Sequence, residues 1–124
     1  MSATGITREF EKEWGAYQGT AYNLAHCNGT AALLSAMFAI GLGAGDELIV
    51  PSVTYWASGH GAKLLGATPV FADVDPKTLC IDPSDIIRRI TPRTRAIIGG
   101  ALLRASVRHG CDHGHCQRAG GEGD

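Results

Sequence analysis

The amino-acid sequence predicts an α/β fold in which short strands alternate with helices and the strands run largely parallel. Two short apolar runs, at residues 48–50 and 69–72, are bounded by charged or turn-forming residues, as strands are. A helical stretch at residues 55–65 separates them. Strands that alternate with helices are typical of layered α/β domains, and 124 residues suffice for one domain with a modest core.

The first third of the chain is predicted to hold two helices. Apolar residues recur at helical spacing between Ile6 and Tyr17, and Gly19 ends this helix. Residues 22–26 are expected to be extended. Residues 30–40 carry apolar side chains on nearly every face of a second helix, which we therefore expect to be buried.

The remaining elements follow from turn and capping signals. The helix at 55–65 stops at Gly66. Asp82 is predicted to cap a further helix that has Pro83 in its first turn and runs to Ile90. Residues 95–98 are predicted to form a third strand.

Composition narrows the class of protein. A net charge of −1 with 44% hydrophobic residues predicts a soluble protein without a nucleic-acid-binding surface. The longest apolar run, 31–42, is too short to span a membrane, and no secretion leader precedes Thr7. The cysteines do not follow the spacing of a disulfide framework, so we expect a cytoplasmic protein.

Residues 28–32 (NGTAA) are a candidate phosphate anchor. Gly29 allows close approach of the backbone to an oxyanion, and Thr30 offers a hydroxyl and an N–H group. The helix that follows directs its positive end at the same place. The alternative interpretation of this pattern is a simple helix N-cap.

Four segments together resemble the DegT/DnrJ/EryC1/StrS family of pyridoxal-phosphate-dependent sugar aminotransferases. They are CNGTAALLSAM, GLGAGDELIVPSVTYWAS, LLGATPVFADVDPKTLCIDPSDI and ITPRTRAII, and the likeness covers residues 6–98. The resemblance implies the early part of the large domain of the fold-type I (aspartate-aminotransferase-like) architecture, left incomplete. Residues 1–98 would be a partial pyridoxal-phosphate-binding large domain.

The resemblance also implies site residues. Gly29, Thr30 and Ala31 match the family's phosphate motif, and Tyr55 takes the place of the aromatic residue that stacks on the cofactor ring. Trp56 stands where the family usually has valine, so we expect it to pack in the core. The acidic pairs 46–47 and 73/75 match strand-entry and turn positions, and we expect them to be structural.

An intact relative would transfer an amino group, usually from glutamate, to a nucleotide-linked keto sugar, and would act as a homodimer. Such reactions serve amino-sugar, cell-surface polysaccharide or secondary-metabolite biosynthesis. The family's Schiff-base lysine and its pyridine-nitrogen aspartate lie downstream, and Lys12, Lys63 and Lys77 do not match that lysine's context. The resemblance thus implies no catalytic residue and no metal ligand in this chain, which alone should be inactive.

Residues 99–124 depart from the family. Their cysteines and histidines (HGCDHGHC) suggest a metal-binding module, but these ligands are crowded and do not match zinc-site spacing. With suitable codons and one base removed after Ile98, the segment reads VVHCYGHPCDMDATMAIANERAVKV, which resembles the family's next segment. We therefore predict an out-of-frame, disordered tail.

Two alternatives remain open. One is a different fold-type I pyridoxal phosphate enzyme, such as a cysteine desulfurase, which also uses a Gly-Thr phosphate turn. The other is a non-catalytic metal-binding module built on the Cys/His tail, in which a true site would order the segment when zinc binds.

Overall fold

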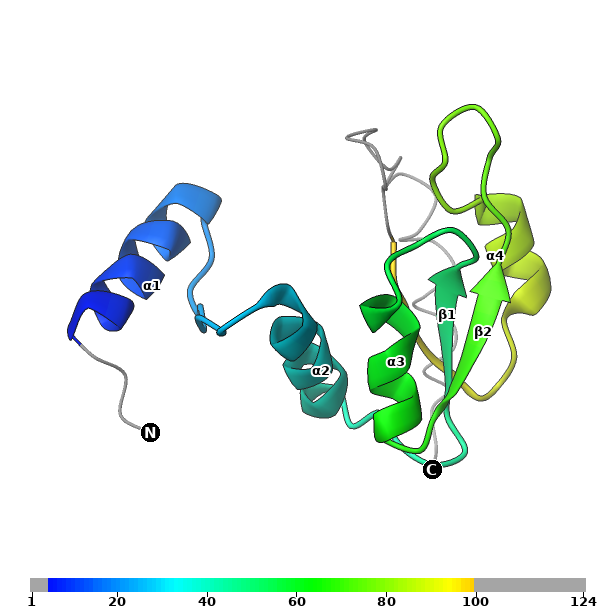
Figure 1. The fold of residues 1–124 in the computed structure, drawn as a ribbon, viewed down its shortest axis with the longest axis horizontal. Helices are drawn as coiled ribbons and strands as arrows, with labels where there is room; N and C mark the ends of the chain where they lie inside the picture. The colour runs from blue at the N-terminus through cyan, green and yellow to red at the C-terminus, as the bar shows by residue number, and fades with distance from the viewer. Residues whose placement is uncertain (1–4, 100–124) are drawn as a thin grey trace, which may run out of the picture. The chain divides into compact units, whose positions relative to one another are not determined.

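The computed structural model describes residues 5–99, which form four helices and three strands (Figure 1). Every helix and strand expected from the sequence is present, with ends within two residues of those expected, and 22–26 is neither helix nor strand. The predictions for the tail concern residues beyond Gly99, which lie outside the described part of the chain. The elements are α1 (Gly5–Gln18), α2 (Gly29–Ala39), β1 (Glu47–Pro51), α3 (Ala57–Leu64), β2 (Thr68–Ala72), α4 (Pro83–Arg89) and β3 (Thr94–Ile97).

The three strands form one parallel sheet in the order β2-β1-β3, as the alternating pattern predicts. β1 is the central strand, and its Ile49 pairs with Val70 of β2 and Ile97 of β3. Pro69 cannot donate a ladder hydrogen bond, and it lies in β2, which pairs with β1 alone among the described strands. A helical crossover joins successive strands, as parallel pairing requires.

Both faces of β1 are covered, because successive side chains of a strand point to opposite faces. Leu48 and Val50 join one apolar cluster with Met37 of α2 and Ala62 of α3. Ile49 faces the other way, into a second cluster that also contains Ala72, Ile81 and Ile86. All five residues of β1 are buried, which explains why the strand reads as a continuous apolar run rather than an alternating one.

The expected burial of α2 is wrong. Met37 is its one buried residue, while Phe38 is 73% exposed. A helix that is apolar on all sides needs partners on all sides. Within the described residues, Met37 belongs to the apolar cluster that contains Leu48 and Val50, and Leu33 packs against that cluster.

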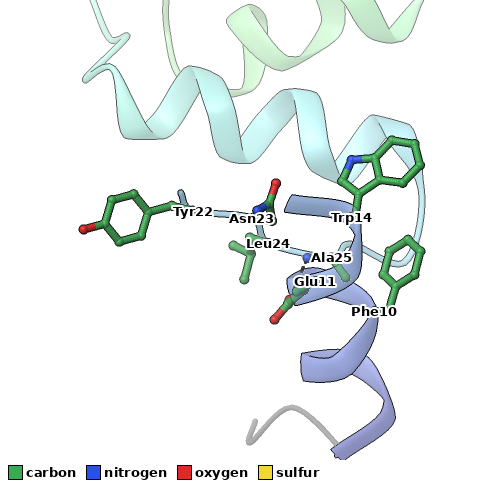
Figure 2. Close-up of a pocket in the computed structure, with 7 residues that line it drawn as sticks. All are labelled: Phe10, Glu11, Trp14, Tyr22, Asn23, Leu24 and Ala25. Carbon is green, nitrogen blue, oxygen red and sulfur yellow. Dashed lines mark hydrogen bonds between the residues drawn. The ribbon is translucent and has the colours of Figure 1, made fainter. Parts of the chain in front are cut away.

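The chain divides into two compact units, one ending at Ala32 and the other beginning at Leu33. In the first unit, Gly19 adopts a φ of 70° just after α1, as its helix-ending role requires. The chain then turns back, since the N–H of Thr20 donates to the carbonyl of Gly15 at 3.0 Å. The N–H of Ala25 donates to Oε1 of Glu11 at 2.8 Å, which fixes residues 22–26 against α1 (Figure 2).

Candidate functional site

The start of α2 is an N-cap built by Asn28. Its Oδ1 accepts a 2.8 Å hydrogen bond from the N–H of Ala31, and its carbonyl accepts one from Ala32 at 3.1 Å. The capping interpretation of NGTAA is therefore confirmed. It leaves other donors unused, because the N–H groups of Gly29 and Thr30 and the Thr30 hydroxyl form no hydrogen bond with any described residue.

Gly29 is not required by the backbone of this turn. Its φ lies outside the left-handed region, and a Cβ placed there would meet no atom within 4 Å. Neither the backbone conformation nor a contact with a described residue therefore requires glycine at this position. A glycine here leaves open space directly beside the unused donors, a cradle that a side chain would begin to fill.

Tyr55 lies in the second unit, in the loop that follows β1. The N–H of Ser52 donates to the carbonyl of Ala72 at 2.7 Å, and the hydroxyls of Thr54 and Ser58 share a hydrogen bond of 2.9 Å. These contacts anchor the loop at the carboxyl end of the central strand, where α/β proteins place their ligand sites. The Tyr55 side chain stays 61% exposed, so its ring is free to stack on a ligand.

The prediction that Trp56 packs in the core is wrong, because its side chain is 57% exposed. The core side of α3 is taken by small residues, namely Ala57, Ser58, Gly61 and Ala62. A helix with such a face packs close to the sheet and leaves no room for an indole. Trp56 instead lies 5.4 Å from the Tyr55 ring and 4.9 Å from the His60 ring, measured between ring centroids.

A cleft of about 370 Å³ lies beside these rings, between α3 and β2. The sequence analysis missed it, because no local pattern shows which residues of a helix and of an edge strand meet. Among the described residues that line it there is no carboxylate, whereas two are basic, His60 and Lys63. Its lining residues are Ser52, Thr54, Trp56, Gly59, His60, Lys63, Pro69 and Phe71.

A second hollow, of about 300 Å³, lies within the first unit between α1 and residues 22–25 (Figure 2). Its acidic residue, Glu11, is already engaged by the backbone of Ala25. Phe10 and Trp14 contribute stacked rings 6.1 Å apart. The remaining lining residues are Tyr22, Asn23 and Leu24.

The structural role expected for the acidic pairs is confirmed. Oδ1 of Asp75 accepts hydrogen bonds from the N–H groups of Lys77 and Thr78, which closes the expected turn. Glu47 is buried, and the hydroxyl of Thr91, followed by the Arg93 guanidinium, holds the pKa of its carboxyl below the ordinary value.

Sequence analysis missed one structural carboxylate, Asp85 of α4. The N–H of Asp73 donates to its Oδ2 at 2.6 Å, and this bond is the main reason for its strongly lowered pKa. Arg89 and Arg88 lower the pKa further through ion pairs. The i, i+3 and i, i+4 spacing of these charges was the signal that could have revealed the cluster.

Residues 5–99 contain no group of three or more metal-binding side chains, and none of their helices is long and apolar enough to cross a membrane. The Cys/His segment considered as a metal site lies outside the described residues. Of the residues predicted for the cofactor, the structure brings Gly29, Thr30 and Ala31 together at the start of α2 in the first unit. Tyr55 belongs to the second.

Curated relatives include an aminotransferase and a synthase. The chain is 45% identical over 96 residues to L-glutamine:2-deoxy-scyllo-inosose aminotransferase of Streptomyces lividus, a match that covers 77% of the chain and 23% of the relative. It is 49% identical over 90 residues to GDP-perosamine synthase of Caulobacter vibrioides, covering 73% and 24%. The chain thus spans about a quarter of the length of these relatives.

The chain also resembles a solved structure, in fold as well as in sequence. The chain superposes on NtdA of Bacillus subtilis, solved with its bound cofactor PMP, with a TM-score of 0.75 and 34% identity, covering 79% of the chain and 22% of NtdA. The fold is therefore an α/β fragment of an aminotransferase architecture, as the sequence predicts. Residues 3–103 match the DegT/DnrJ/EryC1/StrS aminotransferase family, and the chain belongs to that family.

Proposed function

We propose that this chain is the early part of a sugar aminotransferase that uses pyridoxal phosphate. In this proposal, residues 1–98 are a partial cofactor-binding large domain. Membership of the family and the aminotransferase activity in a relative's name support the reaction class. The PMP bound to NtdA supports the cofactor.

The observation that carries the proposal is the unused donor set at the start of α2. Gly29 leaves open space, while Thr30 offers an N–H group and a hydroxyl that no described residue engages. These groups fit a phosphate, which prefers donors at a helix N-terminus. The N–H of Ala31 would be a third donor; in this structure it donates to Oδ1 of Asn28. We propose that Gly29, Thr30 and Ala31 bind the cofactor phosphate.

We propose that Tyr55 stacks on the cofactor ring. Its exposed ring, at the carboxyl end of the central strand, supports this role. The bound cofactor would supply the electron sink that amino transfer requires. Lys12, Lys63 and Lys77 have exposed side chains, and we propose that none of them holds the cofactor.

For the substrate, we propose a nucleotide-linked keto sugar. The Caulobacter relative is named for a GDP-linked compound, GDP-perosamine. The Streptomyces relative is named for 2-deoxy-scyllo-inosose, without a nucleotide. Relatives with and without a nucleotide in their names therefore exist. We propose glutamate, or its amide glutamine, as the amino donor, since the second stands in the name of the Streptomyces enzyme. We also propose that the intact protein is a homodimer and that it acts in the cytoplasm.

The test is a titration of the 124-residue chain with pyridoxal phosphate, measured by calorimetry. Thr30→Val removes the hydroxyl but keeps the shape of the side chain. The loss of a hydrogen bond to a charged acceptor costs about 1.5–3 kcal/mol, so we expect affinity to fall roughly tenfold or more. Thr68→Val, at an exposed position of β2, is the matched control. Equal affinity in both variants would remove Thr30 from the site.

A further inference from the structure

The sequence contains a single Asn-Gly pair, Asn28 and Gly29, and both residues are exposed at the start of α2. In such a pair the backbone nitrogen of glycine can attack the side-chain carbonyl of asparagine, because no Cβ shields that nitrogen. The N–H of Gly29 forms no hydrogen bond with any described residue. A Cβ built on Gly29 would meet no atom within 4 Å, so no described group blocks the attack.

The attack requires the backbone of Asn28 to rotate, and two hydrogen bonds oppose this rotation. The N–H of Ala31 donates to Oδ1 of Asn28 at 2.8 Å, and the N–H of Ala32 donates to its carbonyl at 3.1 Å. Both bonds belong to the first turn of a helix, and helix ends open more readily than helix interiors. The division of the chain into two compact units also falls at this turn, between Ala32 and Leu33.

The other asparagine of the chain, Asn23, differs in each of these respects. It is followed by Leu24, whose side chain shields the attacking nitrogen. Its Oδ1 accepts a 2.7 Å hydrogen bond from the hydroxyl of Thr20, and its Nδ2 donates to the carbonyl of Thr20 at 3.3 Å. The amide of Asn28, by contrast, donates to the Cys27 sulfur alone among the described residues, at 3.5 Å. Asn23 is therefore an internal reference for the reactivity of Asn28.

We propose that Asn28 is a site of spontaneous deamidation. The Gly29 nitrogen forms a bond to Cγ of Asn28 and loses its proton to water, while the bond from Cγ to Nδ2 breaks and ammonia leaves. The product is a succinimide ring, which consumes a water molecule when it opens. Opening at Cγ gives aspartate, and opening at the backbone carbonyl gives isoaspartate. Both products carry a carboxylate where the amide stood.

The consequence of this reaction rests on the proposed function, in which Gly29 and Thr30 bind the cofactor phosphate. Aspartate caps a helix about as well as asparagine, so the aspartate product should keep the start of α2 folded. It nevertheless places a negative charge beside the phosphate, and like charges repel. Conversely, a phosphate that engages the Gly29 N–H holds the first turn closed. Cofactor binding and deamidation therefore oppose each other.

The test incubates the 124-residue chain in mildly alkaline buffer and follows both asparagines by tryptic mapping with tandem mass spectrometry. We expect Asn28 to convert at least about threefold faster than Asn23, because glycine leaves the backbone freer. Gly29→Ala should slow the reaction at Asn28 by at least about threefold for the same reason. Gly43→Ala is the matched control, since a Cβ there also meets no atom within 4 Å. Equal rates at the two asparagines, or in the two glycine variants, would overturn the proposal.

Further measurements separate this inference from the proposed function. Asn28→Asp should bind pyridoxal phosphate about threefold or more weakly by calorimetry, whereas Gln18→Glu, the same charge change on α1, should leave affinity unchanged. Pyridoxamine phosphate, which lacks the aldehyde that reacts with lysines, should slow deamidation of Asn28 and not of Asn23. If Asn28 deamidates selectively but none of these effects appears, the modification site stands and the phosphate anchor fails. If Thr30→Val lowers cofactor affinity but Asn28 reacts no faster than Asn23, the anchor stands and the modification site is wrong.

Discussion

Glu47, at the start of β1, accepts a 2.6 Å hydrogen bond from the hydroxyl of Thr91, which lies 44 residues later and just before β3. The Arg93 guanidinium binds the other carboxylate oxygen, and the Glu47 N–H donates to the Arg93 carbonyl at 2.8 Å. One buried carboxylate therefore joins the entry ends of two adjacent parallel strands. This contact also explains why the Gly-Asp-Glu strand entry is structural.

The stability of the sheet should depend on the charge of Glu47. The Thr91 hydrogen bond, and then Arg93, lower its folded pKa below the unfolded value of about 4.3. A carboxylate with a lowered pKa stabilises the folded chain when the pH is above the unfolded value. This contribution is lost as the pH falls through the folded pKa. We therefore expect Glu47→Gln to be less stable than the parent chain at pH 7 and to lose less stability below about pH 4.3.

Urea unfolding at pH 7 and at pH 3 measures both quantities for Glu47. Glu13→Gln, on the exposed side of α1, removes a carboxylate without a buried partner and serves as the control. The control should follow the parent chain at both pH values. If Glu47→Gln shows the same loss of stability on acidification as the parent chain, the carboxylate does not stabilise the strand entry.

Gly15 should resist replacement even though it lies inside a helix. Alanine normally favours a helix by about 1 kcal/mol over glycine. At this position, however, a Cβ would lie 2.9 Å from the Thr20 carbonyl oxygen and still closer to the Asn23 amide. Because the first of these atoms is backbone, the turn after α1 must shift. We expect Gly15→Ala to destabilise the turn by about 1–3 kcal/mol.

Hydrogen exchange reports the Gly15 effect directly. The Thr20 amide donates to Gly15, so its protection should fall in Gly15→Ala. Gly5→Ala is the matched control, because a Cβ there meets no atom within 4 Å. Unchanged protection of the Thr20 amide in Gly15→Ala would show that the turn accommodates a methyl group.

The sequence predicted those features that depend on neighbouring residues. Asp82 caps α4 as expected, with its Oδ1 accepting a 2.9 Å hydrogen bond from the Ser84 N–H. Burial was harder, as Trp56 and Phe38 show, because it depends on which distant element covers each face. The Glu47–Thr91 bond and the cleft beside α3 likewise join segments that no local pattern connects.

Tyr55 should act through its ring and not through its hydroxyl. Tyr55→Ala removes the stacking face, and aromatic stacking contributes about 0.5–1.5 kcal/mol, so we expect pyridoxal phosphate to bind roughly two- to tenfold more weakly. Tyr55→Phe should bind almost as well as the parent chain. Calorimetric titration measures both, with Tyr17→Ala, an exposed tyrosine of α1, as the control. Equal damage by Phe and Ala would assign the effect to the hydroxyl.

The DNA that encodes residues 99–124 should contain one extra base after the codon of Ile98. After a one-base shift, each new codon takes its first base from the second base of an old codon and its last base from the next codon. The middle base alone is then set by the old wobble position. The amino-acid sequence therefore constrains two bases of every codon in the other frame, and the string VVHCYGHPCDMDATMAIANERAVKV satisfies all of them.

This reading fixes individual wobble bases, which makes it testable codon by codon. Restoring His-Cys-Tyr in the other frame requires GCA at Ala101, CTG or TTG at Leu102, and CTA or TTA at Leu103. We expect the gene to show these codons, and an independently sequenced template to lack the extra base if it arose as a sequencing error. Any other codon at these three positions contradicts the string. The tail would then be a translated segment in its own right, and zinc titration of the chain would test its Cys/His residues as ligands.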